Sequence, residues 1–314
     1  MISFLRSNQP IAWSIVPASL IVGLVMLVLW GGMGVHQAVI QGIGTLISAL
    51  IAHQIYVRRS FVERGDPALA WVVVIWSLVL MPRSLELQEA IWTWAALIFS
   101  GLSLHVALLS HRQPSTSGIQ FRSGALAGLA IACDSTQWGI VVALLLVQLN
   151  TRPAILREWL MLVLGLIWTA WGLNLGLHGL LPTSFLNPMQ LPQFPFENLW
   201  LWGILFWALV GGILLLTEQA QQTLRIQNTR LNTLLFFASM AICSTVHWDL
   251  SGWFNVQIVA LQNTPILAMG IAFFTVQIIP KRDRYATSNP AWAEPVFWVF
   301  VGTLLVLFAL PLLR

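Results

Sequence analysis

Asp134 and Gln137 are polar residues set between apolar ones. They belong to the string Asp-Ser-Thr-Gln, which separates the apolar stretches 124–133 and 138–149. An ionised carboxylate in such surroundings costs free energy unless it is paired, hydrated or protonated, so a carboxylate within a membrane is a candidate functional group. The pattern predicts a site for a polar substrate or for proton coupling. The alternative is a turn between two half-helices whose tip is wet.

A second cluster, Arg152, Arg157 and Glu158, precedes the apolar run that continues to about residue 177. Two guanidinium groups can hold a phosphate or a lipid head group through paired donors, with Glu158 setting their geometry. Alternatively, the arginines are charges that orient the chain during insertion, and Glu158 lies near the positive end of a helix dipole. These three residues join Asp134 and Gln137 as candidate substrate-binding residues.

A third cluster is His247-Trp248-Asp249, which offers a base and a carboxylate one residue apart. If the chain is an enzyme, His247 and Asp249 are its candidate proton-transfer residues. An amphipathic segment at the membrane surface explains the same residues, because such segments combine aromatic and polar side chains. Both interpretations remain open.

The composition of the chain predicts which structural elements position these clusters, because it is too apolar for a water-soluble protein. Of 314 residues, 58% are hydrophobic and 8% charged, with a mean hydropathy of +0.80. Soluble domains carry about 25% charged residues, so soluble classes are excluded and the chain must use lipid as its solvent. Because a membrane helix takes about 20 residues, the length predicts an all-α, polytopic transmembrane bundle of about ten or eleven segments.

The basic residues predict how this bundle is oriented. They lie between apolar runs, and an orientation with the amino terminus in the cytoplasm places thirteen of the fifteen on that side, leaving Arg83 and Arg314 outside. Cytoplasmic loops retain Lys and Arg during insertion, so the net charge of +4 is an orientation signal. We therefore expect membrane lipid, and no nucleic acid, as the partner of this charge.

The stretch 124–149 is unusual because basic residues, Arg122 and Arg152, flank both of its ends. Two half-length helices turning at Asp134 would keep both flanks in the cytoplasm. Each arm would cover about 15 to 20 Å, short of the roughly 30 Å hydrocarbon layer. We therefore expect a short re-entrant-like helix pair within one transmembrane domain, 1–314, between an N-terminal half, 1–123, and a C-terminal half, 150–314.

Gly124, Gly128 and Ala132 recur at four-residue spacing on the first arm of this pair. Small residues at this spacing let a second helix approach closely. They predict a surface for the membrane span of a partner protein.

Motifs for nucleotide hydrolysis and zinc peptidase chemistry are absent from the sequence, which has neither GxxxxGK[ST] nor HExxH. Cys133 and Cys243 lie in apolar stretches without a CxxC or other metal-type spacing. We predict no metal site and no cofactor.

Three parts of the chain carry a resemblance to a known family. They are the opening Phe4-Leu5-Arg6-Ser7-Asn8-Gln9-Pro10, the broken apolar unit around Asp134, and the string Arg152-Pro153-Ala154-Ile155-Leu156-Arg157-Glu158-Trp159-Leu160. Together they resemble an uncharacterised polytopic inner-membrane protein family of Bacteroidetes-type bacteria, whose order of elements is similar over nearly the whole chain. The resemblance implies a multi-pass protein of the bacterial inner membrane. It implies no reaction and no catalytic residues.

Three functions are compatible with these features. Our leading hypothesis is a role in cell-envelope biogenesis, handling a lipid or lipid-linked substrate within the bilayer. The first alternative is a proton-coupled small-solute transporter that uses Asp134 as its coupling site. The second is a noncatalytic membrane scaffold that binds its partner through Gly124, Gly128 and Ala132.

Overall fold

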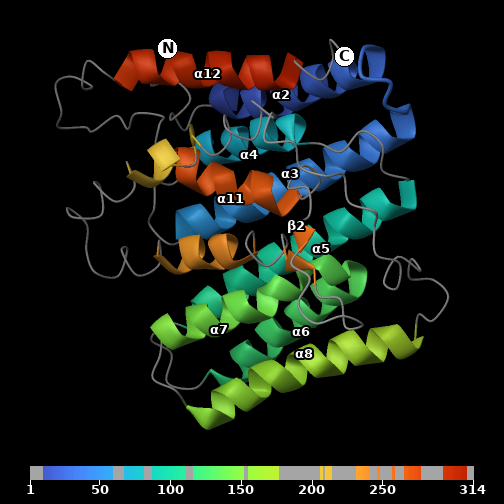
Figure 1. Ribbon diagram of the computed structural model, residues 1–314, viewed down its shortest axis with the longest axis vertical. Coiled ribbons are helices and arrows are strands. Elements are labelled where there is room, and N and C mark those ends of the chain that lie inside the picture. The colour runs from blue at the N-terminus through green and yellow to red at the C-terminus, as the bar shows by residue number, and fades with distance from the viewer. Residues whose placement is uncertain are drawn as a thin grey trace. The chain divides into compact units, whose positions relative to one another are not determined.

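The structure, a computed structural model (Figure 1), is helical. The only strands among the described residues are β1 (Val246–His247) and β2 (Gln257–Ile258), an antiparallel pair in which Val246 faces Ile258. The helical fold class predicted from composition is thus confirmed. The structure describes residues 10–58, 67–80, 87–110, 116–151, 155–176, 206–207, 209–213, 231–240, 246–247, 257–258, 265–276 and 293–309.

Three of the described helices are long and apolar enough to cross a membrane. The candidate spans are Pro10–Leu29, Val35–Ile55 and Ala90–Leu109. They lie in α2 (Pro10–Leu29), α3 (Val35–Arg58) and α5 (Leu87–Leu109), at the positions of three apolar runs of the sequence. Shorter apolar helices occupy Ala68–Val79, Gly139–Thr151, Leu231–Met240 and Pro295–Ala309.

The outward faces of these helices are apolar. On α2 the exposed residues include Ile21 and Val25, and on α3 they include Ile43 and Ile47. A water-soluble helix turns its apolar stripe inward and its polar residues outward. An apolar face turned outward is instead that of a helix whose solvent is lipid, so the described helices are those of a membrane-embedded protein.

The chain forms two compact units, each assembled from separate stretches. The first comprises Met1–Ser84, Pro195–Gln227 and Ala268–Arg314, and the second comprises Leu85–Phe194 and Asn228–Leu267. We expected a single domain divided in sequence order at residues 123 and 149. The observed grouping does not follow chain order, because long-range packing brings the carboxyl-terminal helix into the first unit.

The short helix α4 (Ala68–Val79) lies at the centre of the first unit. Its side chains are nearly all buried, and α2, α3 and α12 (Ala293–Ala309) all pack against it. Trp76 donates its indole N–H to Oγ1 of Thr275, at 2.9 Å, near the end of α11 (Pro265–Thr275). A helix that is apolar all round and only 12 residues long is stable in this position because other helices, not water, surround it.

The second unit contains α5, α6 (Ser117–Cys133), the 3-10 turn η1 (Ser135–Trp138), α7 (Gly139–Thr151) and α8 (Leu156–Gly176). Helix α6 packs against both α5 and α8, and Figure 1 shows α8 running beside it. The sequence of residues 111–123, rich in Gln, Pro, Ser and Thr, is typical of a connector. Its second part is instead helical, because α6 begins at Ser117.

The predicted break at Asp134 is present, between α6 and η1. The first arm is longer than predicted. Helix α6 has 17 residues, or about 25 Å, while α7 has 13 residues, or about 20 Å. The additional length comes from residues 117–123, whose polar side chains had indicated a loop. That the two arms form a re-entrant pair remains a prediction.

Candidate functional site

Asp134 ends α6 in an extended backbone conformation, with φ −150° and ψ 109°. Its backbone N–H still bonds to the carbonyl of Ala130, at 3.0 Å, and its own carbonyl accepts the N–H of Gln137, at 3.1 Å. The side chain of Gln137 reaches back as well, because its Nε2 donates to Oδ2 of Asp134 at 3.5 Å. The structure therefore brings these two candidate residues together in one turn.

The local sequence explains why the chain turns here. An Asp followed three residues later by Gln is a capping-box pattern, in which a short polar residue starts a helix and the later residue reaches back to it. Asp134 thus ends one helix and begins the next. The bonds found here are a variant of this pattern, because the side chain of Gln137 reaches the carboxylate of Asp134 and not its backbone N–H.

The bond to Asp134 uses only the Nε2 end of the Gln137 carboxamide. Its side chain is only 2% exposed, and its Oε1 atom is buried with no hydrogen-bond partner among the described residues. A buried acceptor without a donor is unfavourable, and such groups in folded proteins call for an explanation by water, a ligand or strain. Gln137 can therefore accept one hydrogen bond from a bound molecule next to Asp134, which is half-buried.

Two members of the second predicted cluster, Arg157 and Glu158, lie at the start of α8 and differ in exposure. Arg157 is exposed, whereas Glu158 is 5% exposed and lies in the first helical turn. Neighbouring residues on a helix point about 100° apart, so one side chain faces outward and the other inward. Glu158 therefore points away from the outward face of Arg157, and a joint role of these residues at a head group remains a prediction. Arg152 lies outside the described residues.

The small-residue face of α6 is covered by α8 of the same chain. A Cβ added at Gly124 would overlap the carbonyl oxygen of Leu162, and one added at Gly128 would lie 2.5 Å from that of Leu166. Ala132, one turn further, is buried as well. We expected this face to receive the helix of another protein. The described residues show it already occupied within the chain, because α8 contributes its own small residue, Gly165, at the crossing.

Side-chain hydrogen bonds also join the helices of this unit. Ser103 of α5 donates to the carbonyl of Ser123 of α6 at 2.8 Å, and Ser123 returns a bond to the carbonyl of Ser103 at 3.1 Å. Thr169 of α8 lies 2.8 Å from the carbonyl oxygen of Ala125. These bonds satisfy polar groups that lipid cannot, and they were not anticipated from the sequence.

Two further glutamines escaped the sequence analysis. Gln120 on α6 and Gln148 on α7 are buried, and each has a carboxamide oxygen with no hydrogen-bond partner among the described residues. Close to Gln148 in sequence, Asn150 donates to the side-chain oxygen of Asn232 at 2.6 Å. A glutamine inside an apolar run is the sequence signal that could have found Gln148, because a carboxamide without a partner is costly in lipid. Gln120 lies in the polar stretch 111–123 and carries no such signal.

The third predicted cluster is only partly described. His247 lies in β1, where it pairs with Gln257, while Asp249 falls outside the described residues. Among the residues that the structure describes, no group of three or more His, Cys, Asp or Glu side chains is placed to hold a metal ion.

Comparison of the chain with protein-family models, with curated proteins and with solved structures finds no match.

Proposed function

We propose that the protein is a multi-pass protein of the bacterial inner membrane, with a cytoplasmic amino terminus, that acts in cell-envelope biogenesis by handling a lipid or lipid-linked substrate. The outward apolar faces and inward polar groups support this proposal. A substrate with an apolar tail and a polar head suits such a chain, because the tail stays in lipid while the head meets buried hydrogen-bonding groups.

The observation that carries the proposal is the buried Oε1 of Gln137, which lies beside Asp134 and has no hydrogen-bond partner among the residues that the structure describes. At this position a hydroxyl or amide of a substrate head group would supply the missing donor, and the Asp134 carboxylate would accept a second one.

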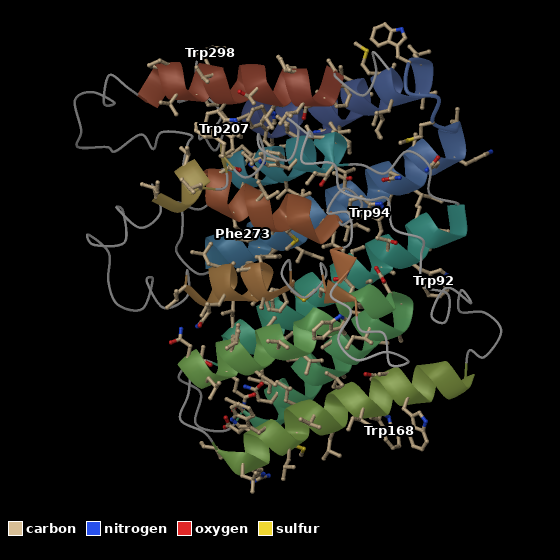
Figure 2. The ribbon with its side chains drawn as sticks, viewed as in Figure 1. Trp92, Trp94, Trp168, Trp207, Phe273 and Trp298 are labelled. Carbon is tan, nitrogen blue, oxygen red and sulfur yellow. The ribbon has the colours of Figure 1, made fainter. Side chains whose placement is uncertain are left out.

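Arg157 adds a charge suited to the phosphate of such a head group. It is exposed at the start of α8, whose outward residues are apolar and include Leu160 and Ile167. Trp168 is 75% exposed and projects from α8 away from α6 (Figure 2). A cation at the end of a lipid-facing helix is a favourable partner for an anionic head group.

The test is to purify the protein in mild detergent and identify its retained lipids by mass spectrometry. We expect one phospholipid or polyprenyl-linked glycan in excess over bulk lipid. Gln137→Leu and Arg157→Ala should each reduce its retention about tenfold, since a hydrogen bond to a charged or buried group is worth about 1.5 kcal/mol. Arg122→Ala, at an exposed arginine of α6, is the matched control and should retain the lipid. Bulk lipid alone, identical in all variants, would leave the proposal without support.

Asp134 also favours a second candidate, a proton-coupled transporter. In this candidate Asp134 is the coupling group, since its carboxylate is half-buried and accepts a hydrogen bond from Gln137. Asp134→Asn should then insert normally, because Asn also caps helices, but should abolish solute-driven proton movement. Proteoliposomes containing a pH-sensitive dye and challenged with a panel of small solutes measure this. Full activity in the variant would exclude Asp134 as the coupling group.

A further inference from the structure

Helix α3 presents polar residues to the inside of the protein and apolar ones to the outside. Gln41, Thr45 and Ser48 are buried, whereas Ile43 and Ile47 are exposed. At about 100° per residue, the three polar positions fall within an arc of about 60° on the side opposite the two isoleucines. Gln41, Thr45 and Ser48 therefore form one continuous polar face of the helix.

The hydroxyl groups of Thr45 and Ser48 differ from most others in the described helices. Both residues are almost fully buried, at 0% and 1% exposure, and neither oxygen has a hydrogen-bond partner among the described residues. A hydroxyl on a helix normally satisfies itself by bonding to a carbonyl three or four residues earlier. Such bonds are made by Ser14, Ser19, Ser110, Thr151, Ser239, Thr275 and Thr303.

The chemistry of the surroundings limits what could satisfy these two hydroxyls. Helices α2, α3 and α4, which pack on one another, contain no acidic residue, so they offer no carboxylate to a cation. Thr45 and Ser48 are also uncharged, and each can both donate and accept a hydrogen bond. A neutral molecule that also does both is the matching ligand.

We propose that the inward face of α3, made by Gln41, Thr45 and Ser48, is a binding site for an uncharged hydroxyl-bearing ligand. Water and a small polyol share this chemistry. The proposal does not rest on the proposed function, whose residues belong to α6, η1 and α8. It assigns to the protein a polar site on the buried face of a candidate membrane span.

Thiol labelling tests whether such a ligand has access. Ser48→Cys and the control Ala49→Cys, an equally buried but apolar neighbour, are prepared with Cys133 and Cys243 replaced by alanine. Both are treated in native membranes with the neutral reagent 2-hydroxyethyl methanethiosulfonate. We expect Cys at position 48 to react about tenfold faster, because the reactive thiolate forms where water reaches it. Slower labelling in the presence of sorbitol would assign the site to a polyol, and an unchanged rate would assign it to water.

Thermal unfolding provides a second measurement in case a cysteine variant does not fold. If a ligand bonds to the hydroxyl, Thr45→Val should lower the melting temperature by about 2 to 4 °C. Thr303→Val, whose hydroxyl bonds to its own helix, is the matched control. Equal labelling at positions 48 and 49, or a higher melting temperature for Thr45→Val, would show a dry face and overturn the proposal.

Discussion

At the scale of single residues, the second unit shows how a membrane protein satisfies polar groups that lipid cannot. The hydroxyl of Thr169 lies 2.8 Å from the carbonyl oxygen of Ala125 on the neighbouring helix and 2.9 Å from that of Gly165 on its own helix, so it can bond across the helix contact. Such bonds between helices contribute modestly, about 0.6 kcal/mol on average in membranes, because the separated helices also find partners. Their main effect is to define which residues face each other.

Thr169→Val tests this contact with a side chain of nearly the same shape. We expect it to lower the free energy of unfolding in detergent by about 1 kcal/mol, since the carbonyl of Ala125 loses a donor at the helix contact. Thr303→Val serves as the control, because that hydroxyl bonds only to the carbonyl of Val299 in its own helix. If both variants lost the same free energy of unfolding, the bond from Thr169 to α6 would contribute no more to stability than a bond within one helix.

At the scale of elements, the contact between α6 and α8 depends on residues without side chains. Gly124 and Gly128 on α6 and Gly165 on α8 each lie against backbone atoms of the opposite helix. Glycine is needed here for closeness, not for an unusual backbone conformation. With no apolar driving force between helices in lipid, close packing of this kind holds them together.

Gly128→Ala should weaken this contact. The added methyl would overlap Oγ1 of Thr169 and lie 2.5 Å from the carbonyl oxygen of Leu166, which cannot move without displacing the helix. We expect a loss of about 1 to 3 kcal/mol, the usual cost of overpacking, measured by thermal unfolding in detergent. Gly172→Ala on α8 is the control, since its methyl would meet nothing within 4 Å. A melting temperature unchanged in both variants would contradict the close approach.

At the scale of the whole molecule, the charge pattern predicts how the chain crosses the bilayer. The described helices include three candidate spans, and the stretch from α6 to α7 is broken at Asp134. The charge pattern predicts that both ends of this stretch lie in the cytoplasm, because Arg122 and Arg152 flank it.

Cysteines in place of Arg122 and Arg152 measure this prediction. We expect a thiol reagent that cannot cross the membrane to label both from the cytoplasmic side in inverted vesicles, and neither from the outside of spheroplasts. A cysteine replacing Arg59, in the predicted cytoplasmic loop, is the positive control. Labelling of positions 122 and 152 from opposite sides would turn the broken pair into a complete crossing and reverse the sidedness of the segments that follow.

The sequence by itself determined the helical class and the lipid-facing character, because both follow from composition. It also predicted the break at Asp134, from the polar string between two apolar arms with basic flanks. Only the tertiary structure showed that α8 covers Gly124 and Gly128, and that Glu158 turns inward while Arg157 turns outward. The physical reason is that in lipid the surroundings of a helix and its packing partners are equally apolar. Periodicity in the sequence can then define a face, but only contacts between distant parts of the chain decide what covers it.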